Sequence, residues 1–168
     1  MIRVQGNNNV KLIECVNPMR NKWRIRWDIQ ISTNESGVQE ASYMEHEFTH
    51  RPTIEEVKNI ITAYYNHITD QKILTGFSFR GNAVWLSTEN QFNYKTAYDL
   101  AIQTNGATLP VTFKFGTDDN PVFHKFSNME EFTEFYTALA LFVQQTLQEG
   151  WDKKYNINWS AYEAVHND

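Results

Sequence analysis

The clearest structural signal in the sequence is the stretch Lys22-Trp23-Arg24-Ile25-Arg26-Trp27-Asp28-Ile29-Gln30-Ile31-Ser32, in which apolar and polar residues alternate strictly. Bulky aromatic and β-branched residues with a period of two are typical of a β-strand. One face of the predicted strand carries Trp23, Ile25, Trp27, Ile29 and Ile31. The opposite face carries Arg24, Arg26, Asp28 and Gln30.

Two further strands are predicted on either side of this stretch. A strand over Val10 to Val16 can pair with it through a turn at Asn17-Pro18, and the turn Asn34-Glu35-Ser36-Gly37 leads into a strand over Val38 to Phe48. The polar residues 1–9 before these strands are predicted to form a flexible arm.

Three capping boxes, in which a Ser or Thr is followed three residues later by Glu or Gln, predict three helices. They begin at Thr53, Thr88 and Ser127, and the helices are predicted to end near Thr69, Thr104 and Gly150. Two hairpins lie between the helices: one over 73–79 and 83–86, the other over 110–115 and 122–126. The aromatic tail is predicted to dock back onto the body through Trp151, Ile157, Trp159 and Tyr162.

Hairpin followed by helix therefore occurs three times, which predicts an α+β protein. We expect an antiparallel sheet built from hairpin–helix units, with the helices mainly on one face. We expect one domain over 1–168, in which residues 10–72 supply the N-terminal strands and a helix.

The composition favours a soluble globular protein. Of the 168 residues, 41% are hydrophobic and 21% are charged, which argues against disorder. The net charge of −5 argues against nonspecific nucleic-acid binding. Cys15 is the only cysteine, so no intramolecular disulfide can form. The N-terminus lacks the apolar core of a signal peptide, and the longest apolar run, residues 138–143, is too short to cross a membrane.

The sequence His46-Glu47-Phe48-Thr49-His50 matches the zinc-protease motif H-E-x-x-H. That chemistry needs the motif on a helix, where the two imidazoles share one zinc ion and Glu47 acts as base. Here the motif follows a predicted strand, which would hold His46 and His50 about 13 Å apart. Pro52 also disfavours a helix through this segment. We therefore favour the polar face of a strand and expect no metal and no cofactor.

Other candidate sites are two polar surfaces. Lys22, Arg24 and Arg26 form a basic stripe that could bind phosphate or an acidic partner, or that solubilises a strand face. A second candidate for partner contact is the face of the predicted helix that carries Asn93, Tyr94, Lys95 and Tyr98. The acidic run at residues 118–120 lacks the spacing of a calcium loop and indicates a β-turn.

Residues 73–159 resemble a small family of domains of unknown function that recurs in phage and prophage proteins. The resemblance is carried by the first hairpin, Gly76-Phe77-Ser78-Phe79 with Gly81, and by the helix segment Asn90-Gln91-Phe92-Asn93-Tyr94-Lys95-Thr96-Ala97-Tyr98. It continues through Leu109-Pro110-Val111-Thr112-Phe113-Lys114-Phe115, the Asp119-Asn120 turn and the long helix from Ser127. Phe115 stands where the family usually has tryptophan. The resemblance implies a setting beside tail fibre genes and no particular reaction.

From this resemblance we expect a noncatalytic phage or prophage tail-module protein, either a virion component or an accessory of tail fibre assembly. It would act by association with protein partners such as tail proteins and with copies of itself, without membrane or nucleic acid, in the bacterial cytoplasm or the virion. One alternative is a zinc-dependent hydrolase that uses His46, Glu47 and His50. Another is a glycan-binding module, because Trp and Tyr rings stack on sugars and Asn amides bond their hydroxyls.

Overall fold

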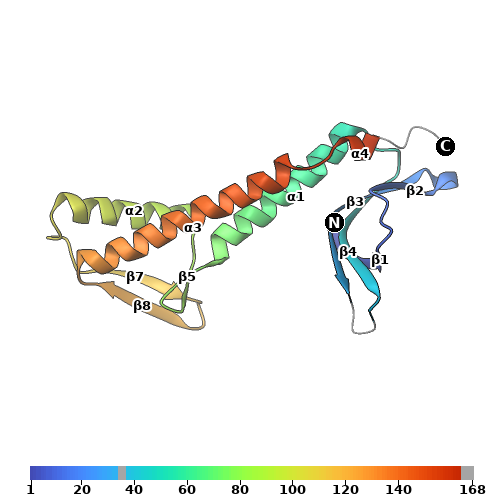
Figure 1. Cartoon of the computed structure of the whole chain (residues 1–168). Coiled ribbons are helices and arrows are strands. Elements are labelled where there is room, and N and C mark those ends of the chain that lie inside the picture. The colour runs from blue at the N-terminus through green and yellow to red at the C-terminus, as the bar shows by residue number, and fades with distance from the viewer. Residues whose placement is uncertain (34–36, 164–168) are drawn as a thin grey trace. The chain divides into compact units, whose positions relative to one another are not determined.

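The computed structural model describes residues 1–33 and 37–163, in which four strands come first and three long helices, separated by hairpins, follow (Figure 1). The predicted α+β class and the antiparallel strand pairing are confirmed. The chain forms two compact units, and each is described by itself below. Unit 1 contains residues 1–64 and the segment that begins at Asn156, and unit 2 contains residues 65–155. The prediction of a single domain stays a prediction.

Unit 1 is built on a four-stranded antiparallel sheet with the order β1-β4-β3-β2. Its strands are β1 (Ile2–Asn7), β2 (Ile13–Asn17), β3 (Lys22–Thr33) and β4 (Gln39–Phe48), and the short 3-10 helix η1 (Pro18–Arg20) joins β2 to β3. The three predicted strands are confirmed, and the predicted turn at residues 34–36 lies outside the described residues. The expectation of a flexible arm is wrong for residues 2–7, because they pair with β4 as an edge strand.

A bulge at Asp28 interrupts the alternation of β3. The register with β4 shifts between Trp27 and Gln30, and Asp28 has a left-handed φ of 50°. The carboxylate of Asp28 accepts hydrogen bonds from Arg3 and, at 3.1 Å, from the Tyr64 hydroxyl. The three residues before the bulge, 25–27, are buried, and the strand from Ile29 onward is exposed. The apolar face predicted for this strand is therefore buried at Ile25 and Trp27 and exposed at Ile29 and Ile31.

The sheet of unit 1 packs on the first turns of helix α1 (Ile54–Thr75). Trp27 is 3% exposed, and its ring meets Tyr64 edge-on at 5.5 Å between centroids. The C-terminal tail also docks on this unit, through the short helix α4 (Ser160–Glu163), but the prediction is wrong for Trp151, which belongs to α3 and is exposed. The buried Tyr162 donates a hydrogen bond to the Arg26 carbonyl at 2.8 Å, and Lys58 lies over the Trp159 ring.

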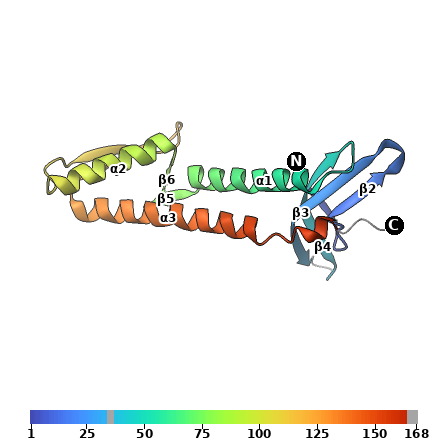
Figure 2. The same ribbon diagram turned by 90° about the horizontal axis from the view of Figure 1, so that it is seen from above.

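Unit 2 contains two hairpins and two long helices. Its elements after α1 are β5 (Phe77–Phe79), β6 (Asn82–Val84), α2 (Thr88–Gln103), β7 (Val111–Gly116), β8 (Pro121–Phe126) and α3 (Met129–Tyr155). Each hairpin forms its own two-stranded sheet, so the strands among the described residues make three sheets rather than the one expected. Helices α2 and α3 lie on one face of the β7–β8 hairpin (Figures 1 and 2). No helix in the described part of the chain is long and apolar enough to cross a membrane.

The core of unit 2 is a cluster of aromatic rings. Five fully buried or nearly buried rings come from both hairpins and from α3: Phe79, Phe115, Phe126, Phe132 and Phe135. Neighbouring rings in this cluster have centroids 4.9 to 6.5 Å apart, within the range of favourable aromatic pairs.

The helix ends differ from the predictions by a few residues. α1 runs past Thr69 to Thr75 and stops at Gly76, where a Cβ would lie 2.5 Å from the Lys72 carbonyl oxygen. α3 begins after Asn128, whose side chain accepts from the Glu131 amide, and continues through Gly150 to Tyr155. The predicted stop at Gly150 is therefore wrong.

The cap of α2 is Ser87 rather than the predicted Thr88. The Ser87 hydroxyl accepts from the Asn90 amide at 3.2 Å. We expect Ser87→Ala to destabilise α2 by about 1 kcal/mol, the usual cost of losing a cap. Thr88→Ala should cost well under that, since Ala is a good residue for the first turn. Hydrogen exchange of the first-turn amides of α2 measures both variants, and equal effects would contradict the assignment.

Candidate functional site

The H-E-x-x-H motif lies on an extended strand, as predicted. His46 and Glu47 belong to β4, and His50 follows the end of the strand. The Phe48 ring lies between the two imidazoles, with centroids 4.8 Å from His46 and 5.6 Å from His50. A strand places every second residue on one face, so a phenyl ring occupies the position between the two imidazoles.

Glu47 and His50 of this motif already have polar partners. Glu47 forms ion pairs with Lys22 at 2.5 Å and with Arg24 at 2.8 Å, and the Lys22 hydrogen bond above all lowers the pKa of Glu47. His50 contacts the Glu56 carboxylate at 2.9 Å. Burial lowers the pKa of His46. These residues do not form the helical pair of imidazoles that zinc-protease chemistry needs, and no cluster of three metal-ligating side chains occurs among the described residues.

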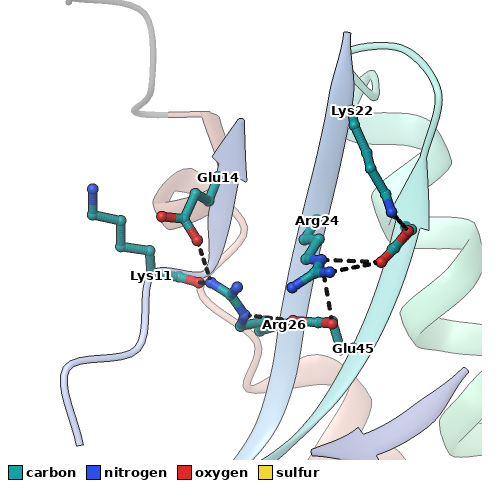
Figure 3. A network of polar contacts seen from close by, with 7 residues as sticks. Lys11, Glu14, Lys22, Arg24, Arg26 and Glu45 are labelled. Atoms are coloured by element: carbon teal, nitrogen blue, oxygen red, sulfur yellow. Dashed lines mark hydrogen bonds and ion pairs between the residues drawn. The ribbon is translucent and has the colours of Figure 1, made fainter. Parts of the chain in front are cut away.

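The predicted basic stripe is an ion-pair ladder across three strands (Figure 3). Lys22 and Arg24 of β3 pair with Glu47 of β4, as described above. Arg26 donates to Glu45 of β4 at 2.9 Å and to Glu14 of β2 at 2.9 Å. Arg26 also donates to the Lys11 carbonyl at 3.0 Å, and its guanidinium lies 5.5 Å from the Tyr43 ring centroid.

Arg26 and Glu45 are the buried part of this ladder. Arg26 is 8% exposed and Glu45 is 5% exposed. Burial acts to lower the pKa of Arg26, but the hydrogen bonds and charges of Glu14 and Glu45 outweigh it and raise the pKa above its ordinary value. Each cation of the stripe therefore faces a carboxylate of this chain. The ion pairs join β2, β3 and β4 and leave no cation of this stripe unpaired for a phosphate.

The second predicted surface divides between core and solvent. Tyr94 is 2% exposed and contacts Phe113 and Phe135 edge-on, so it is a core residue. Tyr98 is half-buried, stacks on Tyr136 and donates to the Thr133 hydroxyl. Lys95 forms an ion pair with Asp99 one turn later, and Asn93 is exposed. The four residues do not form one binding face.

A cavity lies in unit 2, beside α2. We call it the Trp85 cleft; its volume is about 790 Å³. It is lined by residues from the end of α1, the β5–β6 hairpin, α2 and the β7–β8 hairpin: Thr75, Ala83, Val84, Trp85, Asn90, Asn93, Tyr94, Phe113, Lys114, Gly116, Thr117 and Asp118. The volume falls within the range of about 300–1,000 Å³ that is usual for ligand pockets.

Trp85 is the residue of this cleft that the sequence analysis missed. Val84 and Leu86 are both 1% exposed, whereas Trp85 between them is 51% exposed. The period-two pattern of residues 83–86 places Trp85 on the opposite face from Val84 and Leu86, so the same alternation that predicted the strand could have identified an outward-facing tryptophan. Asn93 and Tyr94 were predicted as partner-binding candidates, and both line the cleft.

One family model matches the chain, over residues 56–168, and it is described as a domain of unknown function (DUF4376). The match covers about two thirds of the chain and includes all of unit 2. No curated protein and no solved structure matches the chain.

Proposed function

The chain belongs to the DUF4376 family, and from this premise we propose that it is a noncatalytic phage or prophage tail-module protein that works by protein–protein association. It would be a virion component or an accessory of tail fibre assembly, found in the bacterial cytoplasm or the virion. The phage setting comes from the sequence resemblance of residues 73–159. The observation that carries the association is an open sheet edge in unit 1.

The open edge is the second half of β3. β2 pairs with β3 only from Lys22 to Ile25, and on that side no strand of the described chain pairs with residues 28–33. Ile29 and Ile31 lie on this half and are 37% and 59% exposed. An exposed edge with apolar side chains presents unpaired backbone groups and favours the addition of another strand.

A second copy of the chain is the occupant that this edge suits best. Residues 29–33 carry no charge, so two copies of the segment can lie side by side without repulsion. Asp28 at the start of the segment is already neutralised by Arg3. Antiparallel pairing of the same segment from two copies gives a closed, two-fold symmetric dimer.

We expect the full chain to elute as a dimer, or with co-expressed tail proteins, and Ile31→Lys to abolish both associations. A lysine at this edge introduces like charges that face each other across the two-fold axis. Size-exclusion chromatography with light scattering measures the mass. Ile102→Lys on α2, where the isoleucine is 51% exposed, is the matched control and should leave the mass unchanged. A strict monomer that never joins tail proteins would remove the support for the proposal.

A further inference from the structure

We propose that the Trp85 cleft is a binding site for a neutral carbohydrate. This goes beyond protein association and concerns unit 2 alone. Three features of the cleft point to such a ligand: an unpartnered hydroxyl at its base, an exposed indole at its wall and the absence of an unpaired charge in its lining.

The hydroxyl belongs to Tyr94. Its side chain is 2% exposed and packs in the core of unit 2, yet it also lines the cleft, so it forms the base of the cavity. Within residues 1–33 and 37–163 the Tyr94 hydroxyl has no hydrogen-bond partner, although its ring has three aromatic neighbours. This hydroxyl is not sealed from solvent, because it lines the cleft, so a ligand hydroxyl can replace water there as its hydrogen-bond partner.

The indole belongs to Trp85, which is 51% exposed where it lines the cleft, and Phe113 adds a half-buried ring. The electron-rich face of an indole attracts the polarised C–H groups on the flat side of a sugar ring. An exposed tryptophan beside a cavity indicates a ligand-binding site more strongly than the scattered exposed aliphatic residues of this surface do. Trp85 therefore supplies the stacking surface that a sugar needs.

The polar lining of the cleft is neutral. Its only charged residues, Lys114 and Asp118, form an ion pair with each other at 2.6 Å. The hydrogen bond from Lys114 lowers the pKa of Asp118, so the pair stays charged and balanced at neutral pH. The side-chain amide of Asn93 also lines the cleft, and no hydrogen bond within the described residues engages it. Amides and hydroxyls without net charge suit a polyhydroxylated neutral ligand better than a phosphate or an acidic peptide.

The first test is an array of neutral oligosaccharides of glucose, galactose, mannose and N-acetylglucosamine, with sialylated glycans as the charged comparison. We expect the full chain to bind at least one neutral class, and titration calorimetry with that sugar to give a tenfold or greater loss of affinity for Trp85→Ala. Phe92→Ala is the matched control, because Phe92 is an exposed aromatic of α2 outside the cleft. The proposal would be overturned if the chain bound no glycan or bound only sialylated glycans. It would also be overturned if Trp85→Ala bound the sugar as tightly as the wild-type protein.

Tyr94→Phe is the second test, and it separates ligand binding from folding. The variant keeps the ring and removes only the hydroxyl, so we expect the midpoint of thermal unfolding to stay the same or rise. Sugar affinity should fall about fivefold, the value of one neutral hydrogen bond. Unchanged affinity, or a loss of affinity that follows a loss of folding, would refute the assigned role. Ile31→Lys should leave sugar binding intact, so failure of the edge proposal and failure of this one are distinguishable.

Discussion

Arg26→Met is expected to lower the free energy of unfolding of the four-stranded sheet by about 3–5 kcal/mol. Methionine keeps most of the packing volume but leaves the Glu45 carboxylate, which is 5% exposed, with only Arg24 as a cation, at 3.5 Å. The variant also removes the donor to Glu14 and to the Lys11 carbonyl. A buried charge that loses its partner costs far more than the pair itself contributes. Denaturant-dependent hydrogen exchange of the β3 and β4 amides measures the loss.

The neighbouring cation gives the matched control. Arg24→Met removes the partly exposed ion pair with Glu47 and the longer 3.5 Å contact with Glu45 but leaves Glu45 paired with Arg26, so we expect a loss of less than about 1 kcal/mol. The double variant Arg26→Met/Glu45→Leu removes both buried charges and should recover most of the stability lost in Arg26→Met. Equal losses for Arg24→Met and Arg26→Met, or no recovery in the double variant, would contradict the view that Arg26 and Glu45 are a mutually dependent buried pair.

The alternation of β3 predicted the strand but not which residues it buries. Period two correctly placed Ile25 and Trp27 on a buried face, because local pattern and sheet geometry agree there. It gave the polar face to Arg26, which is instead buried by Glu45 from β4 and Glu14 from β2. Burial of a cation depends on carboxylates brought by other strands. A single strand's pattern contains no information about those partners.

The candidate site likewise depends on residues from distant elements, which a local sequence pattern does not reveal. Asn93 and Tyr94 were identified from a polar, aromatic helix segment, but the cavity that they line is completed by Trp85 and Phe113 from the two hairpins. The two-stranded sheets pack around one aromatic core instead of joining in one sheet, and this arrangement creates the cleft. Hairpins are local and could be predicted from turn residues. The packing of the two hairpins against each other is tertiary structure and could not be predicted from turn residues.

Gly150 illustrates how one residue type supports two different interpretations. A glycine after an amphipathic stretch predicted the end of a helix, since glycine favours the turn that follows one. In the structure Gly150 is buried in the interior of α3, and a Cβ built there would lie 2.3 Å from the Thr69 hydroxyl oxygen. The glycine therefore permits α3 to approach the part of α1 that belongs to unit 2. The surrounding contacts include ion pairing of Lys72 with Glu149 at 2.5 Å.

Gly150→Val is accordingly expected to destabilise unit 2 by about 3 kcal/mol, the upper part of the usual range for overpacking. Thr69 cannot easily yield, because it is β-branched and its hydroxyl is bonded to the Tyr65 carbonyl at 2.8 Å. Hydrogen exchange of the α3 amides measures the loss. Ala140→Val, at an exposed position of the same helix, is the control and should cost less than about 1 kcal/mol, which is the helix propensity difference alone.

The smaller variant Gly150→Ala tests whether the close approach to Thr69 requires the glycine, because this contact reverses the sign of the expected change in the free energy of unfolding. In an ordinary helix interior, alanine stabilises relative to glycine by about 0.5–1 kcal/mol. At position 150 we expect destabilisation instead, because even one methyl group meets Thr69. Thr69→Ala removes the two nearest atoms and leaves the Thr69 Cβ at 3.2 Å, so Gly150→Ala in a Thr69→Ala background should regain the ordinary sign. If Gly150→Ala stabilises the wild-type protein, the close approach of the two helices at this point is not what requires the glycine.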